Sequence, residues 1–218
     1  MTELLHSLSE LDTDVLLFIN GMHNTYFDNF MSAFSGKWVW IPLYVSLVYL
    51  IFRNLRWKPA LGCVVAIAFT IVFADQIGAS LIRPEVCRLR PSNLNNPLSE
   101  WIHIVNGYRG GSYGFPSCHA ANTFGLAFFL YFLFRNQVLT YFVMLWALVT
   151  CYSRAYLGVH YPGDLLAGAL LGLAGAGLCY GLFRWIFKYR KPRILLDAWV
   201  PVCVGCLTVV GMLVYSFF

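Results

Sequence analysis

Six long apolar stretches, separated by short polar segments, set the pattern of this chain. They cover residues 38–52, 60–82, 119–134, 138–152, 164–187 and 195–218. A helix of about 20 apolar residues crosses the hydrocarbon core of a bilayer, and these stretches cross it or nearly do so. The pattern predicts an all-α fold: a polytopic membrane helical bundle of about six transmembrane helices, built as a single membrane-embedded domain over residues 1–218.

The segment before the first apolar stretch, residues 1–36, has an amphipathic pattern instead. It carries five acidic residues: Glu3, Glu10, Asp12, Asp14 and Asp28. It lacks the basic start and the small-residue cleavage site of a signal peptide. We therefore expect amphipathic N-terminal helices that lie in the membrane interface.

Composition and charge also indicate how the chain is oriented in the membrane. Of 218 residues, 59% are hydrophobic and 11% are charged, against about 25% charged residues in a soluble domain. Lys and Arg gather in segments 53–58 and 184–193 and at Arg135, and short loops rich in these residues stay cytoplasmic. The N-terminus, the loop 83–117 and segment 153–163 are then outside, in a multi-pass protein of the cytoplasmic (inner) membrane.

The net charge of +5 follows from this topology. The chain has no basic stripe interleaved with stacking aromatic residues, so a nucleic-acid partner is not expected. The expected partner is the bilayer, and the sequence leaves the oligomeric state open.

Ionisable residues cluster on the side that we expect outside. Arg83, Arg90 and Arg154 each lie beside the end of an apolar stretch, and His119 and His160 lie on the same side. A single arginine at an interface is commonly a headgroup anchor, and a single histidine there commonly makes a structural hydrogen bond. Several such groups together at membrane depth are costly, which indicates a functional site.

The spacing of these residues is more specific than their number. In order they are Arg83, six residues, Arg90-Pro91; then Pro116-Ser117-Cys118-His119; then Ser153-Arg154, five residues, His160, three residues, Asp164. This resembles the type 2 phosphatidic acid phosphatase family, the membrane relatives of the vanadium haloperoxidases, whose motifs read K-x6-RP, PSGH and SR-x5-H-x3-D. The resemblance spans residues 83–164 and implies phosphatase chemistry through a phosphohistidine, with no metal and no cofactor.

Two positions depart from these motifs. The lysine of the family is Arg83 here, which keeps the charge but replaces a point donor by a planar fork. The glycine of PSGH is Cys118, so a position that usually has no side chain carries a thiol, and this leaves the geometry of that loop open. Cys118 and Cys87 both lie beside motif residues on the side expected outside, where a disulfide between them could lock the anion loop. Two independent thiols are favoured, because disulfide geometry is demanding.

The residues themselves also predict phosphate binding. Three arginines on one face supply charge-assisted, bidentate hydrogen bonds for the oxygens of a phosphoryl group. Ser117 precedes an apolar helix, so the free backbone N–H groups of Cys118 and His119 favour an anion. The Ser117 hydroxyl could cap that helix or bind the anion, and the sequence leaves both open.

Three further residues predict the chemistry. His160 and Asp164 are four residues apart, so a helix that starts near Pro162 would bring the carboxylate beside the imidazole. Asp164 can then hold one ring nitrogen and leave the other free to attack, which makes His160 the predicted nucleophile. His119, from the opposite loop, is the predicted general acid and later the base that activates water.

Other phosphatase mechanisms fit the sequence less well. A cysteine-nucleophile loop needs an arginine after Cys and five further residues, and neither Cys87 nor Cys118 has one. A metal site needs clustered carboxylates, yet Asp164 and Glu85 are the only acids near the motifs, apart from Asp75 within an apolar stretch. We expect Asp75 to pair with a motif arginine or to cap a helix.

The stretches 119–134 and 138–152 are short for a full crossing, which places the site near the outer interface, within sideways reach of a lipid. The predicted function is therefore a lipid phosphate or diphosphate phosphatase at the outer leaflet. Undecaprenyl diphosphate is slightly favoured; lipid A, phosphatidylglycerol phosphate and phosphatidate remain open. The loop 85–114 would be a lid that selects the headgroup. A lipid phosphotransferase and a non-catalytic lipid-phosphate transporter are the alternatives.

Overall fold

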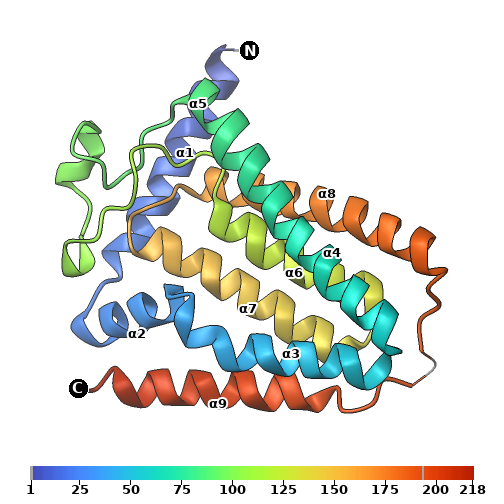
Figure 1. Cartoon of the computed structure of the whole chain (residues 1–218). Coiled ribbons are helices and arrows are strands. Elements are labelled where there is room, and N and C mark those ends of the chain that lie inside the picture. The colour runs from blue at the N-terminus through green and yellow to red at the C-terminus, as the bar shows by residue number, and fades with distance from the viewer. Residues whose placement is uncertain (1, 193) are drawn as a thin grey trace.

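The computed structural model describes residues 2–192 and 194–218, which fold mainly as helices (Figure 1). The helices are α1 (Thr2–Gly21), α2 (Thr25–Ser35), α3 (Ile41–Asn54), α4 (Trp57–Asp75), α5 (Arg83–Val86), α6 (Cys118–Phe134), α7 (Gln137–Tyr156), α8 (Pro162–Phe187) and α9 (Trp199–Tyr215). Each of the six predicted apolar stretches forms a helix, which confirms the all-α prediction. Arg193, the last basic residue of segment 184–193, lies outside the described residues.

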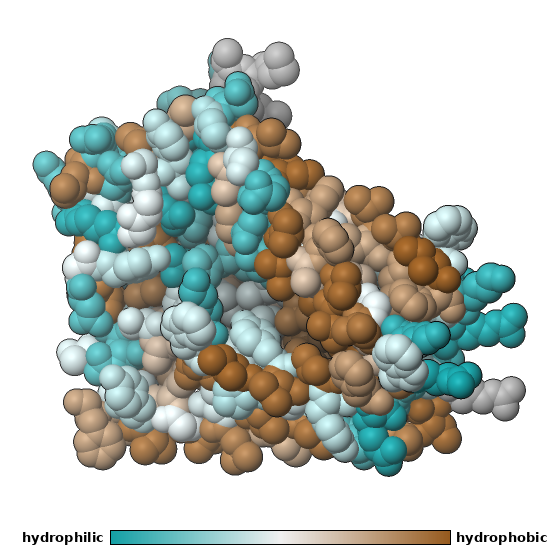
Figure 2. Space-filling view, in the orientation of Figure 1, coloured by the Kyte–Doolittle hydropathy of each residue, from teal (hydrophilic) through white to brown (hydrophobic). Residues whose placement is uncertain are grey.

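The described helices have the length and hydropathy of a multi-pass membrane protein. Among the described residues, three helices are long and apolar enough to cross a bilayer: Trp57–Val86, Gln137–Tyr156 and Pro162–Phe187. A pair bent by 67°, Thr25–Ser35 with Trp38–Asn54, makes a fourth candidate, and α6 and α9 are shorter apolar helices. Figure 2 shows the apolar side chains in a band between hydrophilic ends of the molecule.

The predicted N-terminal helices are present as α1 and α2, but they are not equivalent. Helix α2 buries Phe30, Met31 and Phe34, and together with α3 it forms the bent candidate span. Helix α1 packs on α7 and α8, and its buried Asn20 donates a hydrogen bond to the Tyr156 carbonyl (2.7 Å). Part of the segment expected to be interfacial thus belongs to a candidate span, and the apolar face of α2 is covered by protein.

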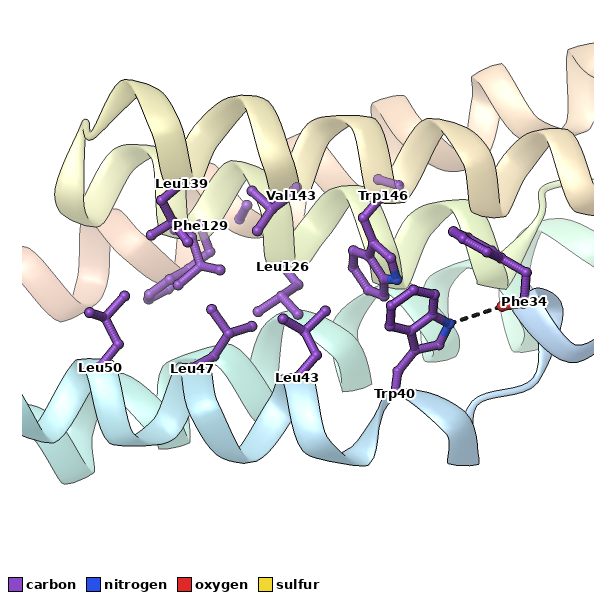
Figure 3. Close-up of a cluster of buried hydrophobic side chains, with 14 of the residues drawn as sticks. Phe34, Trp40, Leu43, Leu47, Leu50, Leu126, Phe129, Leu139, Val143 and Trp146 are labelled. Carbon is purple, nitrogen blue, oxygen red and sulfur yellow. Dashed lines mark hydrogen bonds between the residues drawn. The ribbon is translucent and has the colours of Figure 1, made fainter. Parts of the chain in front are cut away.

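A large apolar cluster joins α3 to α6 and α7 (Figure 3). From one side come Phe34, Trp40, Leu43, Leu47 and Leu50, and from the other Leu126, Phe129, Leu139, Val143 and Trp146. The Trp40 indole N–H donates to the Phe34 carbonyl at 2.9 Å, so the polar atom of this large side chain is satisfied. In a bilayer such packing, more than the hydrophobic effect, holds helices together.

Helices α6 and α8 approach each other closely at glycines. A Cβ added to Gly168 would lie 2.3 Å from the Ser117 carbonyl oxygen, and one added to Gly172 would lie 2.4 Å from that of Ala121. Only residues without a side chain permit this approach. Gly175 packs against α4 in the same way, since an added Cβ would lie 2.9 Å from a ring carbon of Phe73, whereas a Cβ at Gly177 would meet nothing within 4 Å. The contact between α6 and α8 places the start of α6 against the start of α8.

Candidate active site

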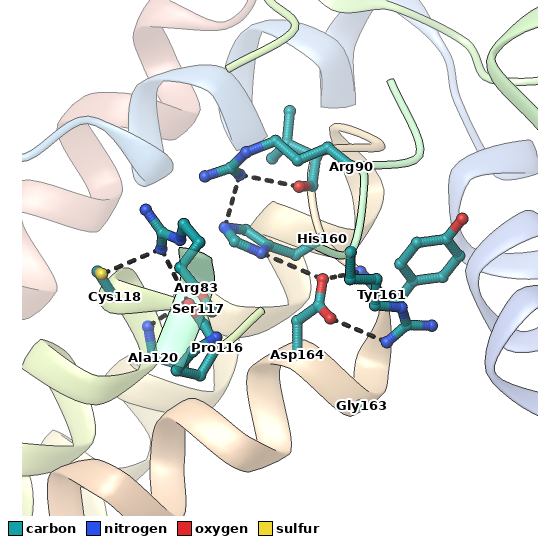
Figure 4. Close-up of polar contacts among 12 residues, drawn as sticks. Arg83, Arg90, Pro116, Ser117, Cys118, Ala120, His160, Tyr161, Gly163 and Asp164 are labelled. Carbon is teal, nitrogen blue, oxygen red and sulfur yellow. Dashed lines mark hydrogen bonds and ion pairs between the residues drawn. The ribbon is translucent and has the colours of Figure 1, made fainter. Parts of the chain in front are cut away.

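The predicted site residues converge where α5, α6 and α8 begin and α7 ends (Figure 4). A π-helical segment, Gln76–Ile82, continues α4 into α5, which starts at Arg83. The Ser117 backbone N–H donates to the Asp164 carbonyl at 2.9 Å, which joins the second motif to the third. His119 is half-buried in the first turn of α6.

The orientation of His160 follows from its two neighbours. Arg90 Nη1 lies 2.7 Å from His160 Nε2, and because a guanidinium can only donate, Nε2 is the accepting nitrogen. In the neutral ring the proton is then on Nδ1, which lies 3.5 Å from Asp164 Oδ2. As predicted, a helix starts at Pro162 and brings Asp164 beside His160. The lone pair of Nε2 faces the arginine side of the site.

Burial and charge keep the His160 ring neutral. The side chain is completely buried, and burial lowers the pKa of His160 well below its usual range, with further lowering by the charges of Arg90, Arg154 and Arg83. Both effects disfavour a second proton on the ring. Only the neutral ring has a lone pair with which to attack, so the environment favours the nucleophilic form.

The three arginines form a cluster of like charge, in which Arg90 and Arg154 are buried and Arg83 is half-buried. Burial, together with the charges of Arg154 and Arg83, lowers the pKa of Arg90 to about 10. The Nε atoms of Arg83, Arg90 and Arg154 are buried and have no hydrogen-bond partner among the described residues. Buried donors of one charge that lack partners are stabilised by an anion with several oxygen atoms. A phosphoryl group is such an anion.

The start of α6 adds backbone N–H groups as a second kind of hydrogen-bond donor. Ser117 is the N-cap of this helix, and its hydroxyl oxygen accepts a hydrogen bond from the Ala120 N–H at 3.4 Å. The capping role that the sequence left open is therefore present, although the bond is long. The first N–H groups of α6 follow this cap, at the end of the helix that favours negative charge.

The two departures from the family motifs contact each other. Arg83 Nη2 donates to the Cys118 sulfur at 3.1 Å and to the Pro116 carbonyl at 2.9 Å. The longer, forked side chain of arginine and the added thiol therefore fit together at the loop whose geometry the sequence left open. Cys87 is exposed and donates to the Pro84 carbonyl at 2.8 Å. Both cysteines are free in the structure, and their independence under oxidation stays a prediction.

Asp75 has a different partner from those predicted. Its Oδ1 accepts a hydrogen bond from Asn122 Nδ2 at 3.2 Å. The prediction of a pairing with a motif arginine or of a helix cap is therefore wrong. The reason is geometric: Asp75 lies one π-helical segment before Arg83 and faces the second turn of α6, where Asn122 is the polar side chain within reach.

The loop 85–114, predicted to be a lid, contains the site residue Arg90 and also contacts the site through Tyr108 and Arg88. The Tyr108 hydroxyl accepts a hydrogen bond from Arg154 Nη2 at 3.1 Å. Arg88 Nη1 donates a hydrogen bond to Asp164 Oδ1 at 2.9 Å. His103 instead pairs with Asp28 at 2.8 Å and stacks on His23, which ties the loop to the N-terminal helices.

Four further residues contact the site, and two of them belong to the predicted lid. They are Arg88 and Tyr108 in the loop, Asp12 in α1 and Ser35 in α2, whose hydroxyl is hydrogen-bonded to Arg154. Arg88 carried a signal, since it is a third basic residue inside the first motif. Asp12 and Ser35 had none, because each reaches the site only through the fold.

A metal centre would need several His, Cys, Asp or Glu side chains in one place. Within residues 2–192 and 194–218, no group of three or more His, Cys, Asp or Glu side chains is arranged to hold an ion. Catalysis without a metal or cofactor stays a prediction, which an experiment below tests.

Comparison with known proteins gives consistent matches. The sequence model of the PAP2 superfamily matches residues 59–188. The chain is 50% identical over 221 residues to the lipid A 4′-phosphatase of Bacteroides thetaiotaomicron, with 96% of each chain covered. It is 31% identical over 186 residues to the lipid A 4′-phosphatase of Porphyromonas gingivalis, with 85% of this chain and 77% of that protein covered. The crystal structure of Aquifex aeolicus LpxE shares the fold: the TM-score is 0.57 at 22% identity, over 81% of this chain and 94% of the other.

Proposed function

This chain belongs to the PAP2 superfamily as a multi-pass membrane lipid phosphatase, and from that premise we propose that it removes the 4′-phosphate of lipid A. The observation that carries this proposal is the 50% identity to a lipid A 4′-phosphatase over 96% of the chain. The sequence taken alone slightly favoured undecaprenyl diphosphate and kept lipid A as an alternative. The comparisons support that alternative better.

In the proposed reaction, Arg83, Arg90, Arg154 and the start of α6 hold the phosphoryl oxygens. His160 Nε2 attacks phosphorus, and the bond from phosphorus to the ester oxygen breaks, with its electron pair left on that oxygen. His119 gives this oxygen a proton. Water that has lost a proton to His119 then attacks the phosphohistidine, which releases phosphate and restores His160.

The contacts of the site support these roles. Asp164 faces the protonated Nδ1 of His160 and would stabilise the positive charge that the ring gains on attack. Arg90 donates to Nε2, so it is placed to donate to a phosphoryl oxygen once Nε2 bonds to phosphorus. The arginine cluster provides the charge stabilisation on which phosphoryl transfer depends.

A panel of lipids tests the substrate. We expect purified protein in detergent, with EDTA present, to hydrolyse lipid A with a kcat/KM roughly tenfold or more above that for undecaprenyl diphosphate, phosphatidylglycerol phosphate or phosphatidate. Phosphate release is the measurement, and His160→Ala protein from the same preparation controls for contaminating phosphatases. Equal rates on all four lipids would contradict the substrate assignment. A strict requirement for added divalent metal would contradict the mechanism.

We further propose that the site faces the periplasm from the inner membrane. Helix α6 begins at the site and ends at Phe134, beside Arg135. The basic residues of segments 53–58 and 184–191 likewise lie at the far ends of α3 and α8. Because basic loops stay cytoplasmic, the site end of the bundle lies outside.

Cysteine labelling of intact cells tests this orientation. Asn95 and Arg190 are both exposed and lie at opposite ends of the bundle. In a cysteine-free background, we expect Asn95→Cys to react with a membrane-impermeant maleimide in cells with a permeabilised outer membrane. Arg190→Cys should react only after lysis. The reverse pattern would place the site in the cytoplasm.

A further inference from the structure

Arg88 bridges two carboxylates that lie 152 positions apart in the chain. Its Nη1 donates to Asp164 Oδ1 at 2.9 Å and its Nη2 donates to Asp12 Oδ2 at 2.6 Å. The side chains of Arg88, Asp12 and Asp164 are 27%, 12% and 0% exposed. This is a largely buried three-residue ion network, and water screens such a network much less than it screens a surface ion pair.

The bridge is held from two more directions. The Arg88 guanidinium lies over the Tyr161 ring, 3.9 Å from its centre. The second oxygen of Asp12 accepts a hydrogen bond from the Gly163 backbone N–H at 2.6 Å. A Cβ at Gly163 would lie 2.9 Å from Asp12 Oδ2, so glycine is what permits this approach. Asp12 therefore ties α1 to both Arg88 and the first turn of α8.

The two oxygens of Asp164 have separate partners. Oδ2 accepts from the Tyr161 backbone N–H at 3.1 Å and faces His160 Nδ1, whereas Oδ1 is bound by Arg88. Tyr161 and Arg88 thus fix both the position and the rotation of the carboxylate. Without Arg88, one oxygen of a completely buried charge would lose its partner, which is a costly state that the carboxylate would relieve by turning.

We propose that Arg88 and Asp12 are positioning residues for the phosphatase reaction, through which helix α1 becomes part of the catalytic assembly. They act by holding Asp164 in the rotamer that aligns His160, and they do not touch the substrate. The proposal rests on the roles proposed above for His160 and Asp164. It also revises the predicted role of Arg88, which was expected to select the headgroup from the lid.

A purely structural reading makes a different prediction. If Arg88 serves only to dock α1 through Asp12, then any opposite-charge pair at these positions would serve equally well. The exchange Asp12→Arg with Arg88→Asp keeps an ion pair between α1 and the loop, but it places a carboxylate against Asp164. The double variant therefore separates docking from positioning.

The experiment measures kcat, KM and thermal unfolding of the full-length protein in detergent, with lipid A and an aryl phosphate as substrates. We expect Arg88→Gln to lower kcat roughly 100-fold, with KM within about twofold, because a small misplacement of a catalytic group costs about this much. Asp12→Asn should lower kcat roughly tenfold, since Arg88 keeps its bond to Asp164. The charge exchange should have a kcat no higher than that of Arg88→Gln.

Two further variants complete the design. Arg88→Lys keeps the charge but cannot bridge both carboxylates as a fork does, so its kcat should lie between those of wild type and Arg88→Gln. Even if Arg88→Gln fails to fold, wild-type kcat in Arg88→Lys would overturn the proposal. The control is Arg53→Gln, which breaks an exposed ion pair with Asp197 far from the site and should leave kcat unchanged.

The proposal is overturned if Arg88→Gln keeps wild-type kcat, or if the charge exchange restores both thermal stability and kcat. His160→Ala is measured in parallel. A His160→Ala protein that still turns over would refute the proposed function itself. Inactive His160→Ala beside fully active Arg88→Gln would refute only the positioning role.

Discussion

His160→Ala is expected to abolish turnover of every substrate, including activated aryl phosphates. No leaving group is good enough to replace the nucleophile, so the loss should be about 10⁴-fold or more, down to the assay background. The ring is completely buried and its Nε2 faces the arginines, so removing it leaves no other imidazole at that position. The matched control is His6→Ala, whose exposed ring pairs with Glu10 on α1.

His119→Ala should behave differently, which distinguishes the two histidines. With an aryl phosphate, whose leaving oxygen needs little help from an acid, phosphoenzyme formation should continue at a substantial rate. Hydrolysis of the phosphohistidine should slow because the water has lost its base, so the intermediate should accumulate. Asp164→Asn should fall between the two variants, since His160 is then present but poorly oriented.

The measurement is rapid-quench labelling with a radiolabelled aryl phosphate. Acid-labile, base-stable label on the protein identifies a phosphohistidine, and digestion maps its position. We expect label on His160 in wild type and more of it in His119→Ala. Label retained in His160→Ala, or mapped to His119, would show that the two roles are reversed.

Arg90→Ala is expected to give the second largest loss, about 10³-fold in kcat/KM, the amount typical of removing a donor that stabilises charge in the transition state. Arg90 is buried and contacts both His160 Nε2 and the Val159 carbonyl, so its guanidinium has a fixed direction. Arg90→Lys keeps the charge but replaces a planar guanidinium, which can donate to two phosphoryl oxygens at once, by a single ammonium, and should lose about 10²-fold.

Vanadate provides an independent measurement for the same residue, because it adopts the five-coordinate geometry of phosphoryl transfer. It should inhibit wild type and raise its unfolding temperature, and both effects should be lost in Arg90→Ala. Arg56→Ala, in an exposed loop at the other end of the bundle, is the control and should behave as wild type. If vanadate inhibited Arg90→Ala as strongly as wild type, the proposed binding of the phosphoryl group by the arginine cluster would be contradicted.

Hydropathy and local motif chemistry were enough to predict the helices and much of the local geometry. Each apolar stretch forms a helix, and Pro162 starts α8 so that Asp164 lies beside His160. These features depend on side chains within about one helical turn of each other, so their spacing in the sequence is their spacing in space. The sequence motifs could not identify the substrate, because they are suited to bind the phosphate group, which all the candidate lipids share.

The sequence by itself thus determined the helical membrane architecture and which residues are suited to bind and attack a phosphoryl group. Only the tertiary structure decided which residues support them through hydrogen bonds: Arg88 with Asp12 and Asp164, Tyr108 with Arg154, and Asp75 with Asn122. The physical reason is that these contacts join residues far apart in the chain, through a guanidinium or amide that could equally have faced water or lipid. Helix packing, such as the close approach of α6 to α8 at Gly168 and Gly172, decides which way these polar side chains point. A local sequence pattern does not contain this information.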